Sequence, residues 1–401
     1  MRQSRYTTRD RQYWQLVFGL GIASFFVFAT MYFFQPILPV LIEQYDINIS
    51  FASLTMSLHT VGLIAGLIVI GFVSDRKGRR LFIFLSILLA TIILFLLPFI
   101  PYFSLIVILR FIQGFTLAGV LAVALAYMAE EIDPKYFSFA ATLYISFIGF
   151  GGMMGRFVSS YLVEKYSYIA TLYVIGTAGI ITLLIIMILL PKSIHFYESE
   201  RRFKEDIKGF TYHLKDRNML LMFGLGMVLQ ISFAGMWTFL PFHLIKEPFQ
   251  LSLQQIAYFY LAYSFGMIIA PIAGWLARKY SIRTLRVIGV VVLTSGMVIT
   301  LGMSLAYIII GLAVICIGFF TSHSLASATV SKEAKQFKGS ASSLYLVSYY
   351  LGVAIGTTAL APIWNMFEWK GIIAITGLLP FIYVIIVRIV RRKNSFQASS
   401  S

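Results

Sequence analysis

Long apolar stretches separated by short polar segments follow one another along most of the 401-residue chain. A helix that crosses a bilayer needs about 20 mainly apolar residues, and such stretches recur from Trp14 to Val387. The pattern predicts an all-α membrane protein with twelve transmembrane helices. The predicted spans are 14–42, 51–73, 81–98, 104–129, 137–161, 168–190, 219–245, 254–277, 284–305, 307–330, 340–362 and 369–389.

The segment 192–218 carries most of the clustered charge and predicts a cytoplasmic linker between two six-helix halves, 1–191 and 219–394. Its apolar residues recur at helical spacing opposite charged ones, as an amphipathic helix on the inner leaflet would require. A solvated linker without lipid contact is the alternative. We expect the tail 395–401 to be disordered. The apolar positions of the linker are Phe196, Phe203, Ile207, Phe210 and Leu214.

The two halves share a short internal repeat, in which residues of the fifth span match residues of the eleventh at one offset of 201 (345 − 144). Repeats of this kind are typical of transporters whose substrate site lies between the halves near the bilayer midplane. The matched residues are Ala140, Leu143, Tyr144, Gly151 and Gly155 with Ala341, Leu344, Tyr345, Gly352 and Gly356.

The composition supports the membrane assignment: 59% of the residues are hydrophobic, 12% are charged, and the mean hydropathy is +0.86. Soluble domains contain about 25% charged residues. The first apolar stretch is too long for a signal-peptide core, and no small-residue cleavage pattern follows it, so we expect it to be retained. Cys316 is the single cysteine, which excludes a disulfide or a cysteine-based metal site within the chain and predicts a packed thiol.

The formal charge is +16, but the basic residues lie in short loops beside apolar stretches and not on one soluble face, so we expect no nucleic-acid partner. The positive-inside rule predicts that both termini lie in the cytoplasm. The inner segments hold Arg2 to Arg11, Arg76 to Arg80, Lys135, the linker, Arg278 to Arg286, Lys332 to Lys338 and Arg388 to Lys393. The outer loops hold Lys165, Lys246 and Lys370 with Glu43, Asp46, Glu164, Glu247 and Glu368.

The most specific motif runs from Gly71 through Asp75, Arg76, Gly78 and Arg79 to Arg80, in the loop predicted between the second and third spans. Glycines allow close packing and a tight turn, and an aspartate can face the positive N-terminus of a neighbouring helix. An ordinary basic loop would need neither both glycines nor the acid. The segment resembles the signature G-x-x-x-D-[RK]-x-G-[RK]-[RK] of the major facilitator superfamily at every defined position.

The resemblance implies the major facilitator fold of two pseudo-symmetric six-helix halves that alternate in access. In that family the loop latches the outward-open state against the start of the eleventh span, near Ser340 here. An acid at the end of the fourth span joins the latch, which would be Glu130 or Glu131. The counterpart from Gly274 to Arg283 has Arg278 in place of the acid, so we expect only the N-terminal latch to be complete.

Two further elements resemble motifs of the same family. Arg110 and Gln113, in Arg-Phe-Ile-Gln-Gly, match an element associated there with proton transfer, although an arginine near a span end can also snorkel to the surface. The segment from Gly149 to Arg156 partly resembles the glycine-rich element of antiporters but lacks its proline. Small-residue helix packing is the alternative, and Arg156 is either an anion contact for substrate or a snorkelling end residue.

No Asp or Glu falls inside a predicted span, which argues against a cationic drug as the cargo. A histidine titrates near neutral pH, so His59 or His323 could carry a coupling proton, although packed histidines are equally common. Gln35 and Gln230 are further polar candidates. We expect an aromatic cavity lining that includes Tyr32, Trp237, Tyr345 and Tyr349, while other aromatic residues form interfacial belts.

Several stretches, including Phe34 to Pro39, Tyr127 to Pro134, Gly318 to Ser324 and Ser340 to Gly352, are similar to the YnfM-like branch of bacterial inner-membrane transport proteins. That resemblance implies efflux of small organic compounds. The leading hypothesis is therefore a monomeric, proton-coupled antiporter that exports small organic or amphipathic compounds, metal-chelating ones included. No ATP-binding G-x-x-x-x-G-K-[ST] motif is present, so the proton gradient is the expected energy source and no cofactor or bound metal is expected.

Two alternatives remain. An importer of a nutrient or organic anion would use Arg110 and Arg156 as clamps, and a lipid flippase would need a lateral portal. An enzyme is not expected, because the sequence contains no paired acids, metal cluster or nucleophile with its base.

Overall fold

The computed structural model describes residues 5–196 and 203–399, with the side chains of 75, 203–207, 338 and 390–399 left out. Contacts divide the chain into two compact units. Unit 1 comprises residues 1–201 and 252–260, and unit 2 comprises 202–251 and 261–401.

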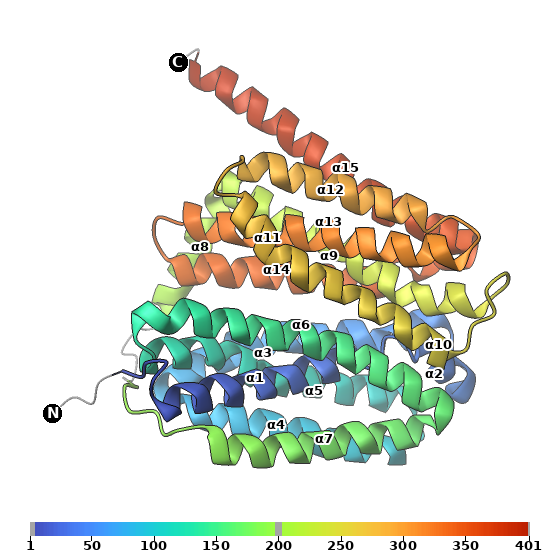
Figure 1. Ribbon diagram of the computed structural model, residues 1–401, viewed down its shortest axis with the longest axis horizontal. Helices are drawn as coiled ribbons and strands as arrows, with labels where there is room; N and C mark the ends of the chain where they lie inside the picture. Colours follow the sequence, from blue (N-terminus) through green and yellow to red (C-terminus); the bar gives the residue numbers. More distant parts are fainter. Residues whose placement is uncertain (1–4, 197–202, 400–401) are drawn as a thin grey trace. The chain divides into compact units, whose positions relative to one another are not determined.

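Unit 1 is a bundle of long helices that run roughly antiparallel (Figure 1). Its helices are α1 Arg11–Tyr32, α2 Leu38–Tyr45, α3 Ile49–Lys77, α4 Arg79–Leu96, α5 Phe103–Glu131, α6 Pro134–Lys165 and α7 Tyr168–Leu189. Residues of α10, Leu253–Ala257, pack on α6. Side-chain caps set several helix starts: Asn48 accepts from the Phe51 N–H at 2.8 Å and Ser167 from the Ala170 N–H at 3.0 Å.

The first predicted span, 14–42, is two helices. Helix α1 ends at Tyr32, and α2 begins at Leu38 with Pro39 in its first turn. Pro36 lies between them, and a proline lacks the N–H that would continue the helix. The short break places Gln35 in a non-helical segment inside the bundle, where it is fully buried.

Unit 2 repeats this arrangement with a different set of helices. They are α8 Phe203–Lys215, α9 Arg217–Ile245, α11 Tyr263–Leu276, α12 Ile282–Ile299, α13 Leu305–Glu333, α14 Lys338–Thr358 and α15 Ala361–Ser399. A 3-10 segment, Tyr258–Ala262, links α10 to α11 and interrupts the predicted span 254–277. Helix α15 bends at Glu368, whose backbone is not helical.

Eleven helices within the described residues are long and apolar enough to cross a membrane. The remaining long helix, α14, has 21 residues at the position of the predicted eleventh span. It is less apolar because it contains four serines and three tyrosines. The observed helices also extend past the predicted spans, so that Glu130, Glu131, Glu164, Glu333 and Glu368 fall at their ends or at the α15 bend. The expectation of acid-free spans thus holds for the central turns only.

The sequence repeat corresponds to one packing arrangement that occurs in both units. In unit 1 a methyl group on Gly151 or Gly155 of α6 would overlap with the α1 backbone at Phe25 or Ala29. In unit 2 the matched Gly352 and Gly356 of α14 lie equally close to the α9 backbone at Met227 and Ile231. Gly151 and Gly155 of the antiporter-like element are therefore helix contacts, which agrees with the packing alternative.

The linker forms α8, which packs on α14 through Gly209 and the buried His213. The Nε2 atom of His213 lies 3.0 Å from the Gln336 carbonyl oxygen. Leu214, on the predicted lipid face, is 49% exposed, while residues 197–202 and the side chains of Phe203 and Ile207 lie outside the described part. Contact with the leaflet stays a prediction. Helix α15 covers residues 395–399 of the tail that we expected to be disordered, and residues 400–401 lie outside the description.

Candidate transport site

Arg110 is a fully buried charge in unit 1. Its guanidinium donates to the carbonyl oxygens of Thr30 at 3.1 Å, Met31 at 3.2 Å and Thr55 at 3.3 Å, and to Gln113 Oε1 at 2.5 Å. Thr30 and Met31 belong to the last turn of α1, where carbonyls lack helical partners and the dipole is negative. The snorkelling alternative for Arg110 is wrong, because the residue is buried among helix ends.

Gln113 extends this centre to a fourth helix, because its Nε2 donates to the Ala90 carbonyl of α4 at 3.0 Å. The Arg110 guanidinium also lies 4.5 Å from the centre of the Phe34 ring and 5.3 Å from that of Phe33. No Asp or Glu of the described residues forms an ion pair with Arg110. A permanent cation at this depth can therefore attract an anionic group, but it cannot itself release a proton at neutral pH.

His59 of α3 is fully buried near Arg110. Neither ring nitrogen has a hydrogen-bond partner among the described residues. Gly114 of α5 lies against the His59 backbone, where a side chain would overlap with the carbonyl oxygen. His59 is thus a closely packed residue with no visible route for a proton.

Arg156 forms a second cationic centre in unit 1. Its Nε donates to Gln35 Oε1 at 2.6 Å and its Nη1 to the Gly152 carbonyl at 2.6 Å, and its guanidinium lies 3.7 Å from the centre of the Tyr32 ring. The residue is 3% exposed, so it does not snorkel to the surface. The structure therefore joins three predicted residues, Arg156, Gln35 and Tyr32, that the sequence treats separately.

In unit 2 the predicted residues His323, Tyr345 and Tyr349 lie together. The Tyr345 hydroxyl is 2.9 Å from His323 Nδ1. The imidazole ring lies 5.5 Å from Phe319, 5.7 Å from Tyr345 and 4.7 Å from Tyr349, measured between ring centres. His323 and Tyr349 are partly buried, in contrast to the fully enclosed His59.

An aromatic cluster continues from His323 toward the middle of α9. Phe233 stacks on Phe319 at 3.8 Å, and Trp237 lies 4.7 Å from Tyr263. The Trp237 side chain is fully buried. A cavity-lining role for Trp237, Tyr345 and Tyr349 stays a prediction, while their aromatic surroundings suit an apolar or aromatic ligand.

The latch motif differs from the predicted loop, because Gly71 to Lys77 belong to α3 and only Gly78 turns the chain into α4. Gly78 has φ +91° and ψ 157°, a backbone region used almost only by glycine. A methyl group at Gly71 would make an ordinary contact with Ala122, so the expected close packing there is wrong. The Asp75 side chain lies outside the described part. Arg76 Nη1 donates to the Phe72 carbonyl at 2.8 Å.

The two acids at the end of α5 have different partners. Glu130 forms an ion pair with Arg79 of the motif at 2.7 Å, so it is the acid that joins the motif in unit 1. Glu131 is fully buried and accepts from the backbone N–H groups of Ile194 and His195 at 2.7 and 2.9 Å. Its other carboxylate oxygen lies 2.9 Å from His195 Nδ1.

His195 is therefore a residue that the sequence interpretation missed. It lies in the linker, with no local motif to mark it, and only the fold brings it to α5. The N-terminal segment joins the same junction, because the Tyr6 N–H donates to the Glu131 carbonyl at 2.8 Å. Burial, together with the nearby Glu131 carboxylate, raises the pKa of Tyr6 above its ordinary value.

Long apolar helices that enclose a few buried polar centres define a helical membrane transport protein. No cluster of His, Cys, Asp and Glu suited to a metal ion occurs among the described residues. The chain belongs to the Major Facilitator Superfamily, whose family model matches residues 20–357. Its relatives are transporters, and the chain is accordingly a transporter and not an enzyme.

Among curated proteins, the chain is 33% identical to the inner membrane transport protein YnfM of Escherichia coli over 96% of this chain and 92% of that protein. It is 25% identical to a benzoate transport protein of Acinetobacter baylyi over 47% of this chain and 42% of that protein. A solved bacterial homolog of the human lysosomal transporter Spinster aligns with a TM-score of 0.78 at 13% identity, over 95% of this chain and 96% of that one. That likeness shows the fold.

Proposed function

We propose that the protein exports small organic or amphipathic compounds across the bacterial cytoplasmic membrane in exchange for protons. The observation that carries the proposal is the His323 centre. It combines a titratable ring, a hydroxyl partner at 2.9 Å and partial exposure inside a membrane helix. A proton carrier needs access as well as titration, and His59 lacks that access.

The proposed cargo is inferred from each unit separately. In unit 2, Phe319, Tyr345 and Tyr349 frame the imidazole. In unit 1, Arg110 and Arg156 are buried cations. Aromatic walls and buried cations favour neutral or acidic amphipathic molecules over cationic drugs. The outward direction rests on the resemblance to the YnfM-like branch, and the two units supply the halves that alternating access requires.

A second candidate is proton-coupled uptake of an aromatic acid. Arg156 carries the observation that favours it, because a guanidinium beside an amide and a phenol ring matches a carboxylate attached to an aromatic ring. The partial similarity to a benzoate transport protein agrees with this chemistry.

Untargeted mass spectrometry of cells and medium, with and without the gene and with and without a protonophore, separates the two candidates. A compound retained by cells that lack the gene, and by protonophore-treated cells that carry it, supports export and identifies the cargo. Slower depletion of an aromatic acid from the medium by cells without the gene would support uptake instead.

Once a cargo is known, proteoliposomes test the coupling role of His323. We expect His323→Gln to abolish transport driven by a pH gradient while substrate exchange without a gradient continues, because exchange needs no net proton movement. His59→Gln is the matched control and should retain the gradient dependence. Retained gradient-driven transport in His323→Gln would contradict the assignment, and its loss in His59→Gln alone would transfer the role to His59.

A further inference from the structure

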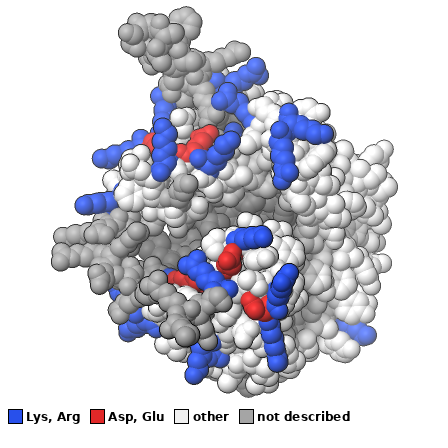
Figure 2. Space-filling model, turned by 60° about the vertical axis from the view of Figure 1, so that its left-hand side comes forward, with Lys and Arg blue, Asp and Glu red and all other residues white. Residues whose placement is uncertain are grey.

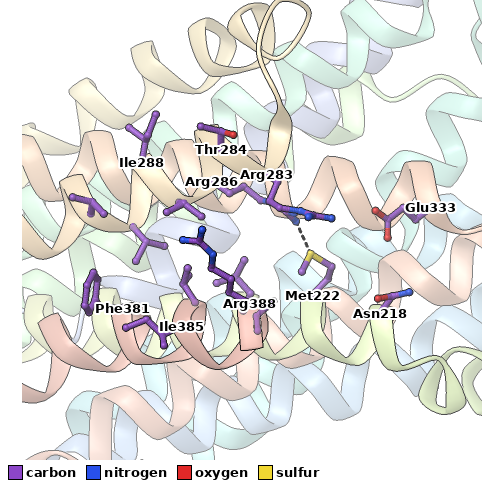
Figure 3. Close-up of a pocket in the computed structure, with 16 residues that line it drawn as sticks. Asn218, Met222, Arg283, Thr284, Arg286, Ile288, Glu333, Phe381, Ile385 and Arg388 are labelled. Carbon is purple, nitrogen blue, oxygen red and sulfur yellow. Dashed lines mark hydrogen bonds between the residues drawn. The ribbon is translucent and has the colours of Figure 1, made fainter. Parts of the chain in front are cut away.

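A pocket of about 1070 Å³ lies within unit 2, where α9, α12, α13 and α15 meet (Figure 3). Arg283 and Arg286 of α12 and Arg388 of α15 line it from different walls. Glu333 is the single acid among the described residues that line it. The side chains that line the pocket therefore carry an excess of positive charge.

Arg286 is the buried member of the three, with 6% of its surface exposed. Its Nη1 donates to the Met222 sulfur at 2.5 Å. Arg283 and Arg388 are exposed. The pocket thus offers these two exposed guanidinium groups to an anionic partner, with the charge of Arg286 beside them.

The arginines lie at the basic end of unit 2. Helix α12 begins at Ile282, so Arg283 and Arg286 occupy its first two turns, where the helix dipole is positive. Arg278 and Lys279 follow α11 at the same end of the bundle. Figure 2 shows the Lys and Arg side chains gathered on this face. In a membrane protein, such a face meets the phosphate groups of the adjacent leaflet.

Apart from Asn218 and Thr284, the rest of the lining is apolar, and part of it is exposed on the outside of the bundle. Val287 is 38% exposed, Ile288 50% and Phe381 40%. A second cavity, of about 380 Å³, shares Val291 and Phe381 with the first and continues along α12 to Ile299. An apolar groove thus leads away from the arginines.

The length of this groove suits a lipid chain. From Arg283 to Val291, α12 rises about 12 Å at 1.5 Å per residue. Half of the hydrocarbon core of a bilayer is about 15 Å thick. A charged group at the arginines and a chain along α12 as far as Val291 would therefore stay within one leaflet.

We propose that this groove binds an anionic phospholipid, with its phosphate at Arg283 and Arg388, near the charge of Arg286, and an acyl chain along Val291 and Phe381. Basic pockets between membrane helices bind anionic headgroups in this way. The lipid would stabilise the junction of α12 with α15 as a bound component and not as transported cargo. A free phosphate ion would use the arginines alone and leave the apolar groove without a role.

The test is native mass spectrometry of the delipidated full-length protein with phosphatidylglycerol and phosphatidylcholine of equal chain length. The variant Arg283→Gln/Arg388→Gln removes the two exposed cations and leaves the buried Arg286 in place. The control Arg278→Gln/Lys279→Gln removes two exposed cations of the same end that do not line the pocket. We expect preferential binding of phosphatidylglycerol, weakened about tenfold or more in the pocket variant and unchanged in the control.

A second variant, Val291→Trp, fills the groove and keeps every charge. It should weaken phosphatidylglycerol binding while leaving the effect of inorganic phosphate unchanged. Equal binding of the two lipids, or undiminished phosphatidylglycerol binding by the pocket variant, would overturn the proposal. If inorganic phosphate alone protects the protein from thermal unfolding as well as the lipid does, and Val291→Trp has no effect, the site holds a free anion and the lipid proposal fails.

Discussion

At the residue scale, Gly78 is the position where backbone geometry demands one amino acid. With φ +91° and ψ 157°, it turns the chain directly from α3 into α4. Nothing lies within 4 Å of a methyl group added there, so the cost of Gly78→Ala comes from the backbone alone. We expect a loss of about 1–3 kcal/mol in the free energy of unfolding, measured by thermal or denaturant unfolding in detergent.

Gly71→Ala is the matched control, because it lies in the same motif but within a regular helix with room for a methyl group. It should be neutral or slightly stabilising. If both substitutions lowered the free energy of unfolding equally, the backbone conformation of Gly78 would not be the cause of the loss.

Single residues were predictable where a motif marked them, and pairings between distant residues were not. Arg110 and Gln113 are three residues apart on one helix face, so their contact follows from helical spacing. Gln35 and Arg156 are 121 positions apart. Their bond depends on the break after α1 and on the packing of α6 on α1. Glu131 and His195 meet only because α7 returns the chain to the end of α5.

At the element scale, the close contacts of α6 with α1 and of α14 with α9 should respond alike to added volume. Gly155→Ala and Gly356→Ala each place a methyl group against a neighbouring helix backbone that cannot yield locally. We expect each to cost about 1–3 kcal/mol through overpacking, seen as a lower midpoint of thermal unfolding in detergent.

Gly152→Ala serves as the control for this pair of substitutions. It lies on the same helix, and its added methyl group would make only ordinary contacts with Tyr32 and Arg156. It should leave the midpoint nearly unchanged. If Gly356→Ala lowered the midpoint and Gly155→Ala did not, the two matched helix contacts would differ in how much they contribute to stability, despite the sequence repeat.

The helices themselves were predictable because bilayer thickness imposes a length on every apolar stretch. Interruptions of the helix within an apolar stretch were not predictable, since hydropathy reports side-chain polarity and not backbone conformation. The break before α2, the 3-10 segment at Tyr258–Ala262 and the bend at Glu368 all lie within or beside continuous apolar runs. Pro36 offered a signal for the first of them. The sequence around Glu368 offered no comparable signal for the bend in α15. The exposed Glu368 carboxylate lies 2.7 Å from the Lys246 Nζ.

At the scale of the whole molecule, each unit places most of the exposed cations that the structure describes at one end of its helices. In unit 1, Arg76, Lys77 and Arg79 surround the turn after α3, and in unit 2 Arg283 and Arg286 begin α12. The opposite ends carry Glu164 with Lys165 and Glu368 with Lys370. From this asymmetry the positive-inside rule predicts a direction across the membrane, with both termini in the cytoplasm.

Single-cysteine labelling tests that direction. In a Cys316→Ala background, we expect Glu164→Cys to react with a membrane-impermeant maleimide in intact cells, and Lys192→Cys to react only after permeabilisation. Both positions are exposed, so a lack of reaction reports the side of the membrane and not burial. The unaltered chain is the control, because Cys316 is fully buried and should stay unlabelled. Reaction of Lys192→Cys in intact cells, with Glu164→Cys protected, would place the basic ends outside. The arginine-lined groove would then face the outer leaflet, although its binding chemistry would be the same.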